Sequence, residues 1–145
     1  KLTSLDDSTD ILIPEDTLDG ATTFTFLPQP EPESEPGSLE FAGSSFLLSA
    51  EDTLGEPVTV FDPPLLVTLT YTDEQIAGLF ETSLALYYWD TGASAWLDAV
   101  TTCPGGEYTR DLDLNTLSLP ICHLSEFGVF GTPRLLTFLP AILRR

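Results

Sequence analysis

His123 is the only histidine in the chain, so any catalytic mechanism that needs an imidazole base must use it. Ser125 and Glu126 follow closely, but neighbouring residues on a strand point to opposite faces and do not assemble a catalytic triad. We therefore expect His123 to be structural, hydrogen-bonding the backbone in a turn. Gly105-Gly106 lies in a Pro-led turn rather than between a strand and a helix, which is not a phosphate-binding loop. The sequence predicts that the protein is not an enzyme.

Asp111, Asp113 and Asn115 have the spacing that begins a calcium-binding loop. An EF-hand also needs Gly at its sixth position and Glu at its twelfth, where this sequence has Thr116 and Cys122. We therefore expect the three polar residues to share the solvent face of a strand. The core face of that strand would carry Leu112, Leu114 and Leu117.

The acidic composition restricts the partners of the protein. The 145 residues include 5 Lys+Arg and 23 Asp+Glu, which gives a formal net charge of −18 and an isoelectric point of about 4.1. Because nucleic-acid affinity comes largely from Lys and Arg that neutralise phosphates, nucleic acid is excluded as a partner. The spacing of the acidic residues does not exclude the carboxylate pair of a glycoside hydrolase, although the sequence has no signature of an aromatic-lined cleft. The cluster of Asp6, Asp7 and Asp10 leaves a weak calcium site open, and the sequence predicts no other metal and no cofactor.

Cys103 and Cys122 flank a segment rich in strand-forming and turn residues, and we expect them to form a disulfide. Such a bond stabilises a domain by roughly 3 kcal/mol in the chain-entropy model and indicates an extracellular or cell-surface location. The alternatives are two buried free thiols in a cytosolic domain, or a metal site that includes His123. The chain begins at Lys1 and has no Met, which indicates that a signal peptide has been removed. One Asn, two Gln and twelve Pro suit a thermophilic source, although a single Lys does not.

Short segments of alternating apolar and polar residues, bounded by turn residues, dominate the chain. They predict about eight to ten strands in an all-β, antiparallel, immunoglobulin-like β-sandwich. Only residues 73–79 are expected to be helical, over one or two turns. We assign residues 1–131 to a single domain with an N-terminal arm and a solvated Pro/Glu-rich loop at residues 28–37. The expected strands lie at 11–13, 24–26, 58–61, 65–71, 82–89, 95–100, 112–121 and 126–130.

Two sets of residues suggest a family. The first set is Ile11–Pro14, where a strand ends in Pro, followed by the small-residue turn and strand of Gly20–Phe26. The second is Tyr87–Asp90 and Trp96, followed by the closing run CHLSEFGVFG at 122–131. Together they cover most of residues 10–131 and resemble ZU5-like β-sandwich domains of bacterial secreted and surface proteins. The resemblance implies an adhesion, scaffold or surface module without catalytic residues.

The residues that follow Gly131 form an apolar tail at 132–145 that ends in two arginines. Read as a strand, it carries apolar residues on both of its faces, so we expect an extra strand that must be covered, because an apolar strand left in water promotes aggregation. Three of the five basic residues lie in this tail, while residues 2–133 carry 1 − 23 = −22 charges. A cationic strand on an acidic body favours contact with another copy over contact between like surfaces. The predicted subunit-interface residues are Arg134, Leu135, Leu136, Phe138, Leu139, Ile142 and Leu143.

These observations predict a structural subunit of an extracellular filament or fibre, which polymerises head-to-tail by β-strand addition, also called donor-strand exchange. Its partners would be copies of itself. The N-terminal arm is the rival donor, but its large apolar residues are only Leu2 and Leu5. No apolar run reaches the roughly eighteen residues of a membrane span.

Three alternatives to filament formation remain at this stage. The tail could be the edge strand of its own domain. It could instead be a sorting or anchoring signal, because it is short, contains Leu-Pro and ends in Arg. The third alternative is a monomeric surface module that recognises carbohydrate or protein through loops, with Tyr87, Tyr88, Trp89 and Trp96 as stacking residues. Aromatic residues on strands are more often core residues or cross-strand pairs, which favours the filament prediction.

Overall fold

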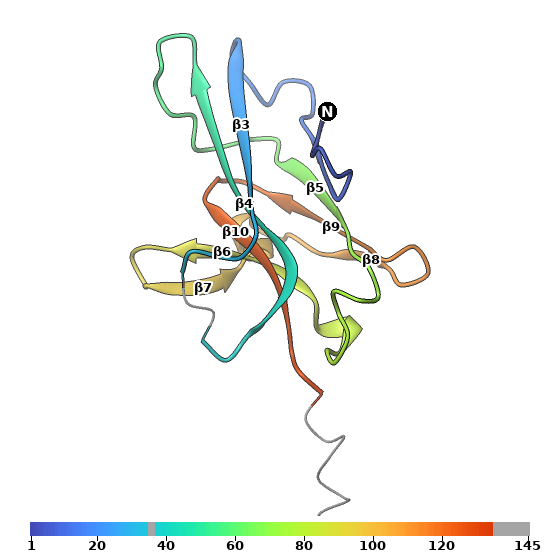
Figure 1. Cartoon of the computed structure of the whole chain (residues 1–145). Coiled ribbons are helices and arrows are strands. Elements are labelled where there is room, and N and C mark those ends of the chain that lie inside the picture. Colours follow the sequence, from blue (N-terminus) through green and yellow to red (C-terminus); the bar gives the residue numbers. More distant parts are fainter. Residues whose placement is uncertain (35–36, 135–145) are drawn as a thin grey trace, which may run out of the picture.

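The computed structural model describes residues 1–34 and 37–134, and strands dominate it (Figure 1). Within these residues, ten strands form two five-stranded antiparallel sheets that enclose one apolar core. The only helices in the described part of the chain are two short 3₁₀ helices. The predicted all-β antiparallel sandwich is therefore confirmed.

Each sheet draws its strands from both halves of the sequence. The first sheet has the order β1 (Leu2–Thr3), β2 (Thr9–Leu12), β5 (Leu65–Thr70), β9 (Thr116–Ile121), β8 (Thr109–Asp111). The second has the order β3 (Thr22–Gln29), β4 (Glu40–Asp52), β10 (Glu126–Gly131), β6 (Ala85–Asp90), β7 (Ala95–Asp98). The 3₁₀ helices are η1 (Glu81–Ser83) and η2 (Ala99–Thr102). The outermost strands are β1 and β8 in the first sheet and β3 and β7 in the second.

The core lies between the two sheets, because successive side chains of a strand point to opposite faces. Val67 of β5 and Leu119 of β9 point inward from the first sheet and are 0% exposed. Phe46 of β4 and Phe127 of β10 meet them from the second sheet, with their rings stacked at 5.5 Å between centroids. An aliphatic layer therefore packs against an aromatic one.

Strand β4 is the longest strand, with 13 residues, and the sequence pattern did not predict it. Its segment holds Gly43 and several serines, which interrupt the alternation of apolar and polar residues. Ser45 is buried all the same, since its hydroxyl donates to the carbonyl of Phe127 at 3.1 Å. Pairing with β3 on one side and β10 on the other overrides the weak strand propensity of the segment.

Two expected elements are wrong. Residues 58–61 do not form a strand; the amide of Val58 instead donates to the carbonyl of Ala50 and closes a loop after β4. Residues 73–79 do not form a helix, because only the amides of residues 75, 77 and 79 donate to the carbonyl three residues earlier, which makes consecutive turns. Gly78, near the end of these turns, adopts a positive φ of 81°.

The segment with calcium-loop spacing forms the hairpin between β8 and β9. The carboxylate of Asp111 accepts hydrogen bonds from the amides of residues 113 and 114, and Asn115 adopts φ of 55°, so residues 112–115 form a turn. Leu112 is 45% exposed and Leu114 is 68% exposed, so the prediction that they face the core is wrong. Leu117, on β9, is buried as expected.

The predicted disulfide between Cys103 and Cys122 is present, with their Cα atoms 5.2 Å apart. Cys103 directly follows η2, which leads from β7 of the second sheet, and Cys122 directly follows β9 of the first. The hydroxyl of Thr102 also accepts a hydrogen bond from the amide of Cys122 at 3.1 Å. The bond therefore links the two sheets covalently.

Replacing both cysteines, Cys103→Ala with Cys122→Ala, should lower the free energy of unfolding by about 3 kcal/mol, because the unfolded chain loses a loop closure. Guanidinium unfolding followed by tryptophan fluorescence measures the change. Thr102→Val is the matched control, since it removes one hydrogen bond to the same turn and keeps the disulfide. Equal unfolding midpoints for the double variant and the parent would show that the bond contributes nothing.

Candidate assembly site

The start of the C-terminal tail is held against the segment before η1. The amide of Phe80 donates to the carbonyl of Thr132 at 2.9 Å, and the amide of Arg134 donates to the carbonyl of Gly78 at 2.8 Å. Leu79 and Pro133 form the bridge between these two bonds. The tail therefore leaves the sandwich at the end of β10, at the bottom of Figure 1.

Arg134 is the only predicted interface residue that the structure describes, and it is exposed. The other six lie outside the described residues, so their predicted role stays a prediction. These are Leu135, Leu136, Phe138, Leu139, Ile142 and Leu143.

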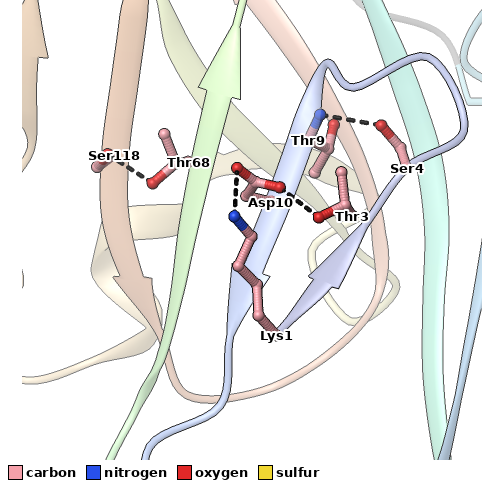
Figure 2. Close-up of polar contacts among 7 residues, drawn as sticks. All are labelled: Lys1, Thr3, Ser4, Thr9, Asp10, Thr68 and Ser118. Carbon is pink, nitrogen blue, oxygen red and sulfur yellow. Dashed lines mark hydrogen bonds and ion pairs between the residues drawn. The ribbon is translucent and has the colours of Figure 1, made fainter.

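The N-terminal arm, the rival donor strand, is paired within its own sheet (Figure 2). Leu2 lies opposite Ile11 in the β1–β2 pair. Asp10 of β2 accepts a hydrogen bond from the hydroxyl of Thr3 at 2.7 Å and lies 3.4 Å from Nζ of Lys1. The arm is therefore engaged in intramolecular contacts, which leaves the C-terminal tail as the stronger candidate for a donor strand.

Strand β3 is an edge strand whose outer side is unpaired in the described part of the chain. Phe24 lies opposite Ala50 of β4, and Phe26 lies opposite Leu48. Ala50 and Leu48 direct their main-chain hydrogen bonds to the far side of β4, toward residues 58 and 125. In an antiparallel ladder such pairs do not bond each other, so the amides and carbonyls of Phe24 and Phe26 point away from β4 into the open edge.

The core is also open beside this edge. The rings of Phe24 and Phe26 point inward, against Phe61 at 6.0 Å and Phe46 at 4.8 Å between centroids, but both side chains are only partly buried. Other partly buried apolar side chains of this flank come from β1 and the segment between β2 and β3: Leu2, Ile13 and Leu18. In the part of the chain that the structure describes, the flank between β1 and β3 therefore offers both unpaired main chain and partly exposed apolar side chains.

Acidic residues predominate in the strands around the β3 edge, and Lys1 pairs with Asp10 of β2. Residues 2–64, which include β1 to β4, contain Asp and Glu but neither Lys nor Arg. Asp19 and Asp52 line the shallow hollow at the beginning of β3. An incoming cationic strand would therefore meet an acidic surface.

Tyr108 and Arg110 close the opposite flank, between β7 and β8. The hydroxyl of Tyr108 donates to the carboxylate of Asp98 and accepts from the amide of Leu86 at 3.1 Å. The guanidinium of Arg110 lies 4.8 Å from the centre of the Tyr108 ring and donates to the carbonyl of Leu84. Side chains thus seal this flank, in contrast to the β1–β3 flank.

The aromatic side chains of β6 and β7 are divided between two faces. Tyr88 lies edge-on to His123 at 4.9 Å between ring centroids, so ring packing is the contact that the structure shows for His123. Trp89 and Trp96 pair across the hairpin on the other face, as cross-strand partners at 5.6 Å. With Tyr87 and Leu39, the two tryptophans line an open hollow of about 420 Å³.

Residues 33–34 of the Pro/Glu-rich loop are docked rather than fully solvated. The carboxylate of Glu126 accepts hydrogen bonds from the amide of Glu33 at 2.8 Å and the hydroxyl of Ser34 at 3.0 Å. The indole of Trp96 donates to the carbonyl of Ser34 at 3.4 Å. Ser125 donates to the carbonyl of Trp89, so neither neighbour of His123 is arranged as a catalytic partner.

The acidic N-terminal cluster does not form a metal site. Asp6 accepts hydrogen bonds from the hydroxyls of Ser4 and Ser8, both at 2.7 Å, and these bonds lower the pKa of its carboxyl. The hydrogen bond from Thr3 likewise lowers the pKa of Asp10. Within residues 1–34 and 37–134, no three His, Cys, Asp or Glu side chains gather closely enough to hold a metal ion. The calcium site that the sequence left open therefore has no support.

Comparison with known proteins finds no matching family model, curated protein or solved structure. The resemblance to ZU5-like domains therefore stays a prediction. No helix in the described part of the chain is long and apolar enough to cross a membrane.

Raising the pH above 10 should destabilise the fold through its buried tyrosines. Burial raises the pKa of Tyr71, Tyr87 and Tyr108, and the nearby carboxylates of Glu81 and Asp98 raise it further. The unfolded chain ionises its tyrosines near pH 10, whereas the folded chain keeps these three protonated. The free energy of unfolding is therefore unaffected below pH 10 and falls as the pH rises above it.

Absorbance at 295 nm and near-ultraviolet circular dichroism, recorded together against pH, test this expectation. Tyrosine ionisation should coincide with loss of tertiary structure, and the dependence should weaken in Tyr108→Phe. Full ionisation of all tyrosines near pH 10 in a chain that stays folded would contradict it.

Proposed function

We propose that the protein is a structural subunit that polymerises head-to-tail by β-strand addition, with the C-terminal tail of one copy as the donor strand. The observation that carries the proposal is that the strand pairs of the described residues form without the tail. Within residues 1–34 and 37–134, the strands of both sheets end by Gly131, and the N-terminal arm has its place in the first sheet. The tail adds further apolar residues beyond these pairs.

Charge supports contact between copies. The tail from residue 134 onward carries three arginines and no acidic residue, whereas residues 2–133 carry −22. Two bodies of this charge repel each other, so a cationic, apolar strand is a suitable connection between them. A contact between two different surfaces that does not close into a ring produces a filament.

An extracellular setting is part of the proposal. The disulfide between Cys103 and Cys122 supports it, because such bonds persist in oxidising compartments. A covalent link between the sheets also suits a subunit that carries load in a filament.

Deleting residues 135–145 of the tail should abolish assembly and leave the fold intact. The chain should end at Arg134, because residues 132–134 hold hydrogen bonds to residues 78–83 that the shortened protein must keep. Sedimentation velocity and negative-stain microscopy should find filaments of the full chain and folded monomers of the shortened one. A full-length variant with Phe138→Asp and Leu139→Asp controls for chain length and should also be monomeric. Filaments from the shortened chain, or a monomeric full chain, would refute the proposal.

A second candidate function is recognition of a neutral oligosaccharide, which the hollow at Trp89 favours. Its described lining residues are Gly37, Ser38, Leu39, Tyr87, Trp89, Ser94, Ala95 and Trp96. They carry no charge, and the partly exposed ring of Trp89 offers an apolar plane beside hydroxyl groups. A neutral ligand suits such a surface better than an anionic one, given the charge of the body.

Cellohexaose and maltohexaose are suitable probes for this second function. If the hollow binds sugars, one of them should change the tryptophan fluorescence of the parent, and Trp89→Ala should abolish the change. Tyr88→Phe is the control, since that ring lies on the other face of β6. An unchanged spectrum with both sugars would exclude these neutral hexaoses as ligands.

A further inference from the structure

We infer that the acceptor for the donor strand is the open edge of β3, and that the tail of a second copy pairs with it antiparallel. This inference rests on the proposed function and identifies the surface that the tail occupies. Edge strands attract added strands because every second residue presents unpaired main-chain groups. Of the four outermost strands, β1 has two residues, β8 three and β7 four, whereas β3 has eight.

The side chains of β3 suit an added strand as well. On its inner face, Phe24 and Phe26 are only partly buried, so apolar residues of a donor would cover them. On its outer face, Thr23 and Thr25 are exposed and Leu27 is 53% exposed. An extended donor with apolar residues on both faces, such as residues 135–143, has surface to cover on each side.

The apolar segment 135–143 is too short to pair along the whole of its own β3. Gly131 lies opposite Glu40 of β4, whereas β3 begins to pair with β4 only at Ser45 and continues to Asp52. From Arg134 the chain would have to return past eight residues' length of sheet, roughly 26 Å at the strand rise, before it reached β3. The apolar segment 135–143 has nine residues, so only about one of them would remain to pair with the eight-residue strand β3. Full pairing therefore requires a second copy, in line with the positions of β3 and the end of β10 in Figure 1.

Pro140 fixes which tail residues face β3. Proline has no amide hydrogen, so residue 140 belongs to the set whose main-chain groups point away from the acceptor. The even-numbered residues of the tail share that set, and the odd-numbered ones bond the amides and carbonyls of Phe24 and Phe26. In an antiparallel pair, Thr25, whose own main-chain groups bond β4, then lies opposite an even-numbered tail residue.

Cysteine cross-linking tests this arrangement in assembled filaments. Directly opposite residues that are not hydrogen-bonded have Cα atoms roughly 4.5 Å apart, within the range that a disulfide spans. Thr25→Cys is combined in turn with Leu136→Cys, Phe138→Cys or Ile142→Cys. After mild oxidation, the combination in register should give a ladder of covalent oligomers on a denaturing gel.

Two matched controls accompany the test. Thr25→Cys with Leu139→Cys should give no ladder, because the side chain of an odd-numbered residue lies on the other face of the donor. Thr70→Cys with Phe138→Cys should give none either, since Thr70 is an exposed threonine on β5, which is paired on both sides.

The outcomes separate this inference from the proposed function. Filaments that give no ladder with position 25, or an equal ladder with position 70, would overturn β3 as the acceptor and leave strand addition by the tail in place. A full-length chain that forms no filaments would overturn both.

Discussion

A strand at the edge of a sheet leaves the main-chain donors and acceptors of every second residue without a partner in the sheet. The constraint applies to the four outermost strands of the sandwich. Three of these four strands leave few main-chain groups unpaired, since β1, β7 and β8 have four residues or fewer. Strand β3, with eight residues, does not. The proposed assembly is based on that difference, since the tail of a second copy would add a strand to β3.

The two flanks of the sandwich differ in a way that supports the same account. Between β7 and β8, Tyr108 joins Asp98 to the main chain of β6, and Arg110 covers the tyrosine ring. Between β1 and β3, half-buried apolar side chains surround an unpaired edge. The buried hydroxyl groups of the two flanks differ as well. The hydroxyl of Tyr108 is hydrogen-bonded, whereas that of Thr9 on β2, seen in Figure 2, has no hydrogen-bond partner among the described residues. Within the described residues, side chains therefore cover the β7–β8 flank, whereas the β1–β3 flank keeps partly exposed apolar side chains beside an edge strand.

Most of the fold could be predicted from local sequence, and most of the candidate site could not. The alternation in segments such as 65–71 and the hairpin at Trp89 and Trp96 are local signals, and they predict the strands correctly. Strand β4 escapes such reasoning because Gly43 and its serines are stabilised by partners distant in sequence. The edge position of β3 could not be predicted from local sequence, because its residues do not show whether one or both of its sides are paired. That follows only from the order of the strands in the sheet.

Residue-resolved amide hydrogen exchange, compared between filaments of the full chain and the monomer that ends at Arg134, tests the central claim most directly. The amides of Thr23 and Thr25 face β4 and should exchange slowly in both forms, which makes them internal references. The amides of Phe24 and Phe26 should exchange fast in the monomer and become protected in the filament. Equal, fast exchange of these two amides in both forms would contradict the account, because no strand would then have been added to β3.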